Sequence, residues 1–351
     1  MINDSKRMQR VVVKSKSEIL LEETPRPVPA RNEILVATLV SGVCGSDIHA
    51  WQGHHPFVPL PYNPGHEVVG IIKEIGADVT DLIVGQRVTV EPTLPCWNCK
   101  RCKQGEENLC ENLQFFGCVY DQGGMAQYFT IPANRVHLIP SGFSDEEAAL
   151  IEPLATPVHA VRLAALGSGD LTGKSVAILG AGTIGLLTLA AAKHFNAKKI
   201  VMTDLLPSKR ERALRLGANA VLDATRSDLV EAVLQSLGES ADVVFDCVSV
   251  QSSINQAITM ALKGGTVVVV GVPAAPVTVP LPLMQDLQIR LQGSATYLPI
   301  DFAEATAMIQ AGEIQVNEIV TAIFPMESVE LAFQKASSGE QVKVLVRFAT
   351  A

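Results

Sequence analysis

Short apolar runs rich in β-branched residues alternate with stretches rich in proline and glycine from residue 11 to about residue 152. Runs of this length and composition are typical of strands. We expect strands at 11–13, 33–40, 67–75, 86–90 and 126–131. Glycines within such runs mark turns, bulges or close backbone approach. The pattern therefore predicts a β-dominated domain at the start of the chain.

The periodicity changes near residue 147, where an Ala- and Leu-rich helical pattern begins and runs to residue 165. Pro153 and Pro157 lie near its start, where proline is tolerated or kinks a helix, so we place a domain boundary here. Beyond Lys174, strand-like runs alternate with segments of helical length. The six runs are 175–179, 200–203, 220–222, 243–245, 266–270 and 289–292. This alternation predicts an α/β fold with a doubly wound parallel sheet.

The last fifty residues return to a mixed pattern. Segments 301–311 and 327–337 have the spacing of amphipathic helices, and 342–348 has the composition of a strand. No further strand is expected close to it in the sequence. We therefore expect 342–348 to return to the first domain and pair there.

Composition and charge indicate what kind of molecule the protein binds. The chain has 351 residues, 48% of them hydrophobic, which favours two soluble domains. Its formal charge is −8, and no Lys/Arg-rich run occurs, which argues against nucleic acid or a membrane as partner and favours a small molecule. The N-terminal residues show no signal-peptide pattern, and no apolar run is long enough for a bilayer. A cytoplasmic location is the resulting expectation.

A candidate metal site lies within residues 44–49, where Cys44, Ser46, Asp47 and His49 occur together, followed by Gly65-His66-Glu67. Thiolate, imidazole and carboxylate groups are the ligands of a catalytic zinc with an open position. The alternative is that the cysteine is a small buried hydrophobic residue and the histidine a core residue.

Four further cysteines form a second candidate site: Cys96, Cys99, Cys102 and Cys110. Four thiolates in one loop predict a closed, structural zinc site, which would order a loop with little core of its own. An iron–sulfur cluster is the alternative, but the last gap is seven residues and Glu111 follows Cys110, which departs from the bacterial spacing. Cys118 and Cys247 lie outside the set and are interpreted as core residues.

A dinucleotide fingerprint follows the predicted strand 176–179. Gly180, Gly182 and Gly185 have the spacing G-x-G-x-x-G, a helix is expected to continue to residue 195, and Asp204 ends the next strand. Such a turn brings the backbone and a helix N-terminus to a pyrophosphate. Asp204 would bind the ribose hydroxyls and favour NAD over NADP, although Lys209 and Arg210 lie nearby. The alternative is a glycine-rich turn without a cofactor.

Taken in order, these motifs resemble the zinc-dependent medium-chain dehydrogenase/reductase superfamily. The resemblance rests on Cys44-x-Ser46, on Gly65-His66-Glu67 with Gly70 and Gly76, on the four-cysteine loop, on Glu152-Pro153 and on the glycine fingerprint. It is greatest for the sorbitol (polyol) dehydrogenase branch, with threonine and butanediol dehydrogenases close by. It implies a GroES-like catalytic domain over 1–155, completed by 296–351, and a Rossmann domain over 156–295. It also implies a homodimer or homotetramer, with 277–281 extending the sheet between subunits.

The resemblance also assigns roles to residues. Cys44 and His66 would hold the catalytic zinc with either Glu67 or Glu152, and Asp47 would orient His66. Ser46 and His49 would relay the proton of the substrate hydroxyl, with Glu152 in the same catalytic set. The alternatives are that Ser46 is a helix N-cap and His49 a surface imidazole. The expected cofactor-binding residues are Gly180, Gly182, Thr183, Ile184, Gly185, Asp204, Lys209, Val270, Val272, Ser294 and Thr296.

Two positions depart from the polyol branch. Ala50 stands where an aromatic residue is expected, and Thr296 stands where an arginine is expected. Both positions line the polyol site in that branch, so we expect a broader alcohol specificity. The predicted activity is an NAD-dependent, zinc-dependent oxidation of a secondary alcohol or polyol, with threonine 3-dehydrogenase or 2,3-butanediol dehydrogenase as alternatives. A zinc- and dinucleotide-binding protein without turnover is the non-enzyme alternative, which the intact set of site residues disfavours.

Overall fold

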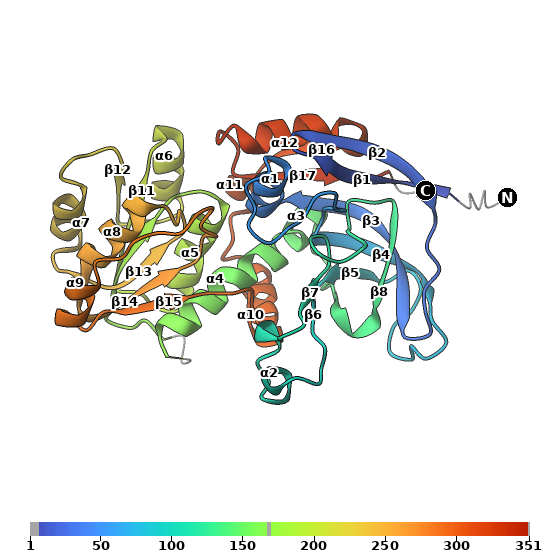
Figure 1. Cartoon of the computed structure of the whole chain (residues 1–351), viewed down its shortest axis with the longest axis horizontal. Coiled ribbons are helices and arrows are strands. Elements are labelled where there is room, and N and C mark those ends of the chain that lie inside the picture. The colour runs from blue at the N-terminus through green and yellow to red at the C-terminus, as the bar shows by residue number, and fades with distance from the viewer. Residues whose placement is uncertain (1–6, 167–169, 350–351) are drawn as a thin grey trace. The chain divides into compact units, whose positions relative to one another are not determined.

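The computed structural model describes residues 7–166 and 170–349 and divides into two compact units (Figure 1). Unit 1 comprises Met1–Glu152 and Val320–Ala351, and unit 2 comprises Pro153–Ile319. The first boundary lies in the helical stretch where the sequence pattern changes. The second lies at residue 320, whereas the sequence-based division was placed at residue 296.

Unit 2 contains a six-stranded sheet in which all neighbouring strands are parallel. The strand order is β12-β11-β10-β13-β14-β15. The strands are β10 (Ser175–Leu179), β11 (Lys199–Asp204), β12 (Ala220–Asp223), β13 (Ala241–Asp246), β14 (Ala261–Val269) and β15 (Arg290–Gly293). Each overlaps one of the six predicted runs, and the order reverses direction beside β10. The predicted doubly wound sheet is therefore confirmed.

Helices flank this sheet (Figure 1). Those that contact its strands are α5 (Thr183–His194), α6 (Pro207–Arg215), α7 (Leu229–Leu237) and α8 (Gln251–Met260). Unit 2 also contains most of α4 (Ile151–Ala164), with α9 (Leu281–Asp286), α10 (Pro299–Gln310) and α11 (Val316–Ile319). On one face, α7 and α8 bury apolar side chains such as Val233 and Ile258 against Ala177 and Val201 of the sheet. Residues 277–280 form no strand within this chain.

Ion pairs explain why α10 belongs to unit 2 rather than to the catalytic domain. On α10, Asp301 Oδ2 lies 2.8 Å from His159 Nδ1 of α4. Glu304 on the same helix accepts from Arg162 Nη2 at 2.9 Å and lies 3.1 Å from His194 Nε2 of α5. Asp301 is fully buried, so separating α10 from α4 would leave its carboxylate without the partner that it has on α4. No local sequence pattern predicts these ion pairs.

Unit 1 is built on a sheet of order β16-β17-β3-β4-β5-β9, with β8 also paired to β3. Its strands are β3 (Glu33–Val43), β4 (Glu67–Ile75), β5 (Arg87–Val90), β8 (Tyr128–Pro132), β9 (Val136–Leu138), β16 (Val320–Pro325) and β17 (Lys343–Arg347). Two small sheets pair β1 (Arg7–Ser15) with β2 (Glu18–Pro25) and β6 (Thr93–Leu94) with β7 (Gln114–Phe115). The predicted β-rich domain is thus present.

The helices of unit 1 are short except for α12. They are α1 (Gly45–Trp51), α2 (Lys100–Lys103), α3 (Asp145–Ala148) and α12 (Val329–Ser337), with 3₁₀ turns η1 (Glu107–Leu109), η2 (Ala133–Arg135) and η3 (Met326–Ser328). No helix in the ranges that the structure describes has the length and apolar character to cross a membrane.

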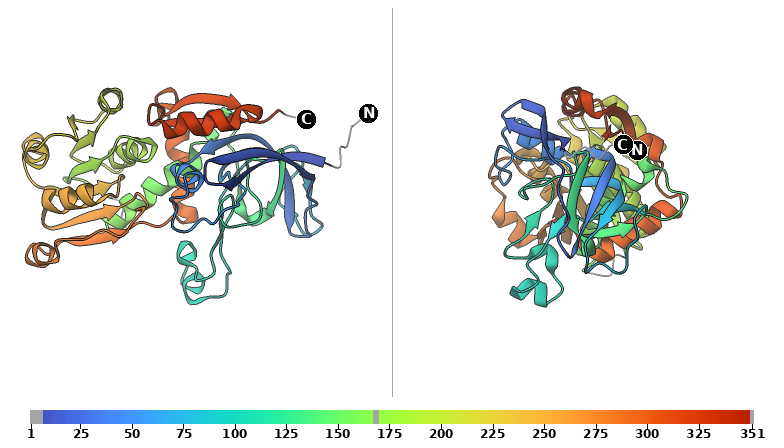
Figure 2. Two further views of the ribbon diagram at one scale, coloured as in Figure 1. Left: turned by 45° about the horizontal axis from the view of Figure 1, so that its top comes forward. Right: turned by 90° about the vertical axis from the view of Figure 1, so that its right-hand side faces the viewer.

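The C-terminal strand β17 pairs antiparallel with β3, with Val344 opposite Val43. The expected return of 342–348 to the first domain is therefore confirmed. On its other side β17 pairs in parallel with β16, a strand that the sequence pattern did not predict. Both chain ends share one core, and Figure 2 shows the red helix α12 beside the blue N-terminal strands. In this core the Trp51 ring of α1 meets the Phe333 ring of α12 edge-on at 6.0 Å.

Candidate active site

Cys44, His66 and Glu67 come together in unit 1. Their ligand atoms all lie within 4.8 Å of one another. Strand β3 ends at Val43 and β4 begins at Glu67, and the antiparallel register places Gly42 opposite Glu67. The sheet itself therefore brings a residue just beyond one strand beside the first residue of the next. Cys44 is half-buried, and the other two side chains are buried.

Glu67 is held by a lysine from the far end of the chain. Lys343 Nζ lies 2.6 Å from Oε1 and 2.8 Å from Oε2 of Glu67, and it also donates to the Val43 carbonyl oxygen at 3.2 Å. A Cβ atom at Gly42 would lie 1.8 Å from the carboxylate, so glycine is required there. Burial lowers the pKa of Lys343, but the charges of Glu67 and Cys44 outweigh burial and raise that pKa.

His66 is oriented by a different group from the one expected. Its Nδ1 atom lies 3.7 Å from Cys118 Sγ, whereas Asp47 accepts from the Cys44 N–H at 3.0 Å and from the Tyr62 hydroxyl at 3.1 Å. The interpretation of Cys118 as a simple core residue is thus incomplete. Because Nδ1 contacts Cys118, the other ring nitrogen, Nε2, is left to bind a metal ion. Metal-binding histidines usually divide their two ring nitrogens in this way.

The electrostatics of this site suit a cation. Burial lowers the pKa of His66, but Cys118, Asp47 and Cys44 outweigh it and raise that pKa well above its ordinary value. Burial raises the pKa of Asp47, while His66 lowers it. A buried group of thiols and carboxylates around an imidazole would stabilise a divalent ion in the same way as it stabilises a proton, and the donor set matches zinc.

Glu152 is the second residue of α4 and is 5% exposed. It contributes to the negative field that raises the pKa of Lys343, so it lies near the same ammonium group. Within the described residues, the compact ligand set contains Cys44, His66 and Glu67 and does not extend to Glu152. The choice of third ligand between the two glutamates stays a prediction.

Ser46 and His49 both lie on α1. The N-cap of α1 is Cys44, and Asp47 bonds the N–H of that residue, so the alternative interpretation of Ser46 as the N-cap is wrong. His49 is half-buried, and burial, followed by the nearby His54, lowers its pKa. A neutral imidazole at neutral pH is able to accept a proton.

Ala50 is 1% exposed and belongs to the core cluster that also contains Trp51. An aromatic ring at this position would therefore have to displace core side chains rather than simply line an open site. The expectation of broader specificity loses its support from Ala50 and depends on Thr296 alone.

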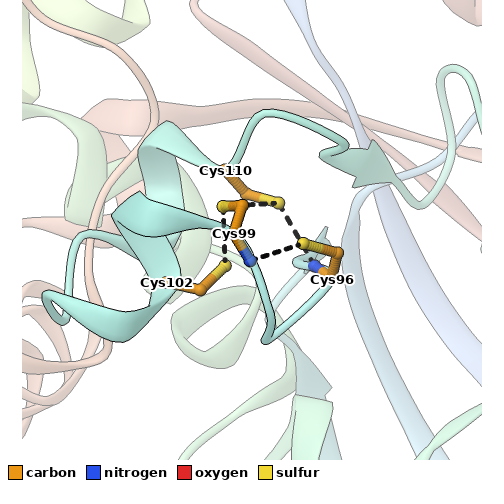
Figure 3. Close-up of side chains that lie close together, drawn as sticks. All are labelled: Cys96, Cys99, Cys102 and Cys110. Atoms are coloured by element: carbon orange, nitrogen blue, oxygen red, sulfur yellow. Dashed lines mark hydrogen bonds between the residues drawn. The ribbon is translucent and has the colours of Figure 1, made fainter.

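The four cysteines of the second candidate site converge in one loop (Figure 3). Cys99 Sγ lies 3.5 Å from Cys102 Sγ and 4.0 Å from Cys110 Sγ. The Cys96 N–H donates to Cys110 Sγ, and the Cys99 N–H donates to Cys96 Sγ. Backbone N–H donors, first that of Asn98, lower the pKa of Cys96 to about 6. Desolvation, followed by the neighbouring thiols, instead raises the pKa of Cys102 to about 12. Four sulfur ligands gathered in this way are suited to a tetrahedral metal site, where the ion itself would stabilise the thiolates.

Arg135 connects this loop to the sheet of unit 1. It forms a buried ion pair with Glu91, lies 3.3 Å from Glu107 of η1, and places its guanidinium 5.6 Å from the centre of the Trp97 ring. Nothing in the sequence pattern marks Arg135, because its partners lie 28 to 44 residues away. It is a residue that sequence analysis missed.

The dinucleotide fingerprint of unit 2 has the expected geometry. Gly180 follows β10 with φ +91°, and Gly182 is the N-cap of α5. A Cβ atom at Gly185 would lie 1.9 Å from the Gly180 carbonyl oxygen, so the helix can approach the strand only with glycine there. Thr183 and Ile184 begin α5, where the backbone N–H groups of the first turn would face a pyrophosphate.

Asp204 lies beside the glycine turn, as the sequence predicts. It ends β11, its Oδ2 atom accepts from the Ala181 N–H at 2.7 Å, and its Oδ1 atom accepts from the Leu206 N–H at 2.8 Å. A carboxylate fixed in this way at the end of the second strand suits the ribose hydroxyls of a dinucleotide.

Large apolar side chains remain exposed at the carboxyl ends of the parallel strands. Leu205 follows β11 and is 62% exposed, and Val248 and Val272 lie beyond β13 and β14 and are 44% and 41% exposed. An apolar group such as an adenine ring would cover such residues. Of these, only Val272 was expected from the sequence. Val270 is buried, and its N–H donates to the Asp246 carbonyl oxygen.

Ser294 and Thr296 follow β15. Their hydroxyl oxygens are buried and have no hydrogen-bond partner among the residues that the structure describes. Buried hydroxyls are normally paired, so a bound ligand is a natural partner for both. Thr296 also has φ +49°, which is strained for a β-branched residue and is found most often at functional sites.

Comparison with known proteins identifies two family models along the chain. Residues 30–141 match the family described as alcohol dehydrogenase GroES-like domain, and residues 183–311 match zinc-binding dehydrogenase. D-xylulose reductase A of Aspergillus oryzae is 32% identical over 333 residues, which cover 92% of each chain.

Solved structures give the same result. L-idonate 5-dehydrogenase of Escherichia coli is 29% identical with a TM-score of 0.88, over 97% of this chain and 98% of that one. A zinc-binding dehydrogenase of Sinorhizobium meliloti, bound to NADP, is 31% identical with a TM-score of 0.89, over 97% and 99%. The chain therefore belongs to the zinc-dependent medium-chain alcohol dehydrogenase family, in its polyol dehydrogenase branch.

Proposed function

We propose that this protein oxidises a secondary hydroxyl group of a sugar alcohol, or of a related diol, to a ketone and transfers the hydride to NAD. The observation that carries the proposal is the pair of complete sites in one chain. Unit 1 gathers Cys44, His66 and Glu67, and unit 2 presents the glycine turn with Asp204. The named relatives, a D-xylulose reductase and an L-idonate 5-dehydrogenase, support a sugar-derived substrate.

The residues of unit 1 would bind the metal ion and hold its ligands in place. Cys44 and His66 would hold a zinc ion with Glu67, whose position among the compact ligand set supports it over Glu152. A zinc ion bound there would act as a Lewis acid that lowers the pKa of the substrate hydroxyl. Lys343 keeps Glu67 fixed by bonding both carboxylate oxygens, so that the ligand does not have to be ordered when the metal binds.

Ser46 and His49 would move the proton away from the substrate. Both are half-buried on the short helix that begins directly after Cys44, and neither is used as the helix cap. The lowered pKa of His49 keeps its imidazole neutral near pH 7, so it can accept the proton that the Ser46 hydroxyl passes on.

NAD rather than NADP is supported by Asp204. Its carboxylate would accept hydrogen bonds from the two ribose hydroxyls and repel a 2′-phosphate. One relative of similar fold is bound to NADP, so the choice of NAD is tested by experiment. The Cys96, Cys99, Cys102 and Cys110 group would hold a second, structural zinc, and the expected homodimer or homotetramer and cytoplasmic location stay predictions.

The test is an alcohol panel with NAD and NADP. Sorbitol, xylitol, galactitol, 2,3-butanediol and threonine are compared by absorbance of the reduced cofactor, for the wild type and for Cys44→Ser. We expect turnover of at least one polyol or diol with NAD and its loss in Cys44→Ser. Zinc and dinucleotide binding without turnover of any alcohol would favour the non-enzyme alternative, and a wild type confined to threonine would overturn the polyol assignment.

A further inference from the structure

Two carboxylates end neighbouring strands at the ligand-binding edge of the parallel sheet. Asp204 ends β11 and Asp223 ends β12, and the two residues face each other in the register of these strands. Ligands of doubly wound folds bind beyond the carboxyl ends of the strands. Asp223 therefore lies one strand away from the carboxylate that we assign to the adenosine ribose.

The Arg210 guanidinium is bonded to both residues. Its Nη1 atom donates to the carbonyl oxygens of Asp204 at 2.9 Å and Leu205 at 2.7 Å. Its Nη2 atom lies 3.1 Å from Asp223 Oδ2, and the Arg210 side chain is only 19% exposed. From the sequence alone this arginine could bind a phosphate, but in the structure its guanidinium already bonds to groups of the protein.

Asp223 is itself well anchored. Its Oδ1 atom accepts from the Thr225 N–H at 2.9 Å and from the Thr225 hydroxyl at 2.7 Å. These bonds, with the backbone one first, lower the pKa of Asp223, so the carboxylate is ionised at neutral pH. An anchored, charged partner is able to fix the position of a flexible arginine.

We propose that Asp223 is a second determinant of cofactor choice, because it holds Arg210 in an ion pair and so denies a 2′-phosphate its cationic partner. The inference rests on the proposed dinucleotide-dependent function. A guanidinium recognises phosphate through paired N–H donors. Replacing Asp204 alone removes the repulsion toward NADP but leaves Arg210 tied to Asp223. Freeing its Nη2 atom for a phosphate requires a change at Asp223 as well, while its Nη1 atom stays bonded to the backbone carbonyl oxygens of Asp204 and Leu205.

The experiment measures binding rather than turnover. Zinc-loaded wild type, Asp204→Ser, Asp223→Asn and the double variant are titrated calorimetrically with NAD and with NADP, without any alcohol. Asp204→Ser should bind NAD about 10- to 100-fold more weakly, as expected for lost bonds to a charged group. The double variant should bind NADP about tenfold more tightly than Asp204→Ser does, since it gains one charge-assisted contact.

Three control variants identify the cause. Arg210→Ala, added to the double variant, should abolish the gain in NADP affinity, whereas Lys209→Ala should leave most of it. Asp228→Asn, combined with Asp204→Ser, removes the same charge from an exposed pair with Arg226 and should give no gain.

Two results would overturn the inference while leaving the proposed function intact. One is equal NADP affinity of Asp204→Ser and the double variant, and the other is a gain that survives Arg210→Ala. A wild type that binds neither dinucleotide would instead contradict the proposed function itself, and a wild type that prefers NADP would contradict the role of Asp204.

Discussion

The buried Lys343–Glu67 pair gives the sharpest test of how the metal site is built. Lys343→Met removes the ammonium group and leaves the stem of the side chain nearly unchanged in size. The two side chains are 3% and 1% exposed, and the Lys343 Nζ atom contacts both carboxylate oxygens of Glu67 and the Val43 carbonyl oxygen. The variant leaves a carboxylate buried without its cation.

Breaking such a buried pair on one side costs about 3–5 kcal/mol of unfolding free energy. We expect a loss of this size in metal-free protein. Zinc at Cys44 and His66 would supply positive charge to Glu67, so the loss should be smaller with zinc bound. Glu67→Gln combined with Lys343→Met should recover part of the stability, because a neutral amide tolerates burial better than an unpaired carboxylate.

Urea unfolding followed by tryptophan fluorescence is the assay. Both tryptophans of the chain, Trp51 and Trp97, lie in unit 1, so the signal reports the unit that contains the pair. The pKa of Lys343 is raised in the folded state. The stability that the pair contributes is therefore fully present below the ordinary lysine pKa of about 10.4 and is lost as the pH rises through the folded-state value.

Two results would refute this reasoning. A metal-free Lys343→Met variant within about 1 kcal/mol of the wild type would mean that the pair contributes no more than a surface salt bridge. If the double variant recovers no stability, the lower unfolding free energy of Lys343→Met comes from altered packing rather than from the unpaired Glu67 carboxylate.

Three further predictions concern the metals and the backbone. Elemental analysis should find about two zinc ions per chain, with Cys44→Ser and Cys99→Ser each losing a different one; stoichiometric iron with a visible charge-transfer band would contradict this. Gly65→Ala should cost more than 2 kcal/mol in urea unfolding, because φ is +105° and the Cβ atom would lie 2.3 Å from a backbone nitrogen. Gly85→Ala, with φ +93° and open space, is the control and should cost about 1 kcal/mol. Thr296→Gly should raise thermal stability by about 1 kcal/mol through relief of its positive φ while weakening cofactor binding; unchanged binding would show that the Thr296 hydroxyl is not a ligand.

Local patterns along the chain were enough to predict most of the elements and the motifs. Short apolar runs rich in β-branched residues marked most long strands of unit 1, and the change to strand-like runs separated by helical segments marked the sheet of unit 2. Such patterns are local, because side chains return to the same face every two residues in a strand and every 3.6 residues in a helix. The zinc and dinucleotide motifs were also visible, since each packs its ligands or glycines into a short segment, as at Cys96–Cys110 and Gly180–Gly185.

The residues that complete the sites come from distant parts of the chain, and folding alone brings them together. Lys343 meets Glu67 across 276 positions, and Cys118 meets His66 across 52. The strand β16 and the assignment of α10 to unit 2 likewise depend on partners far along the chain. Ala50 was expected near the substrate and lies in the core. Such pairings depend on how the whole chain packs, because a buried charge or hydroxyl accepts whatever partner the fold brings within reach.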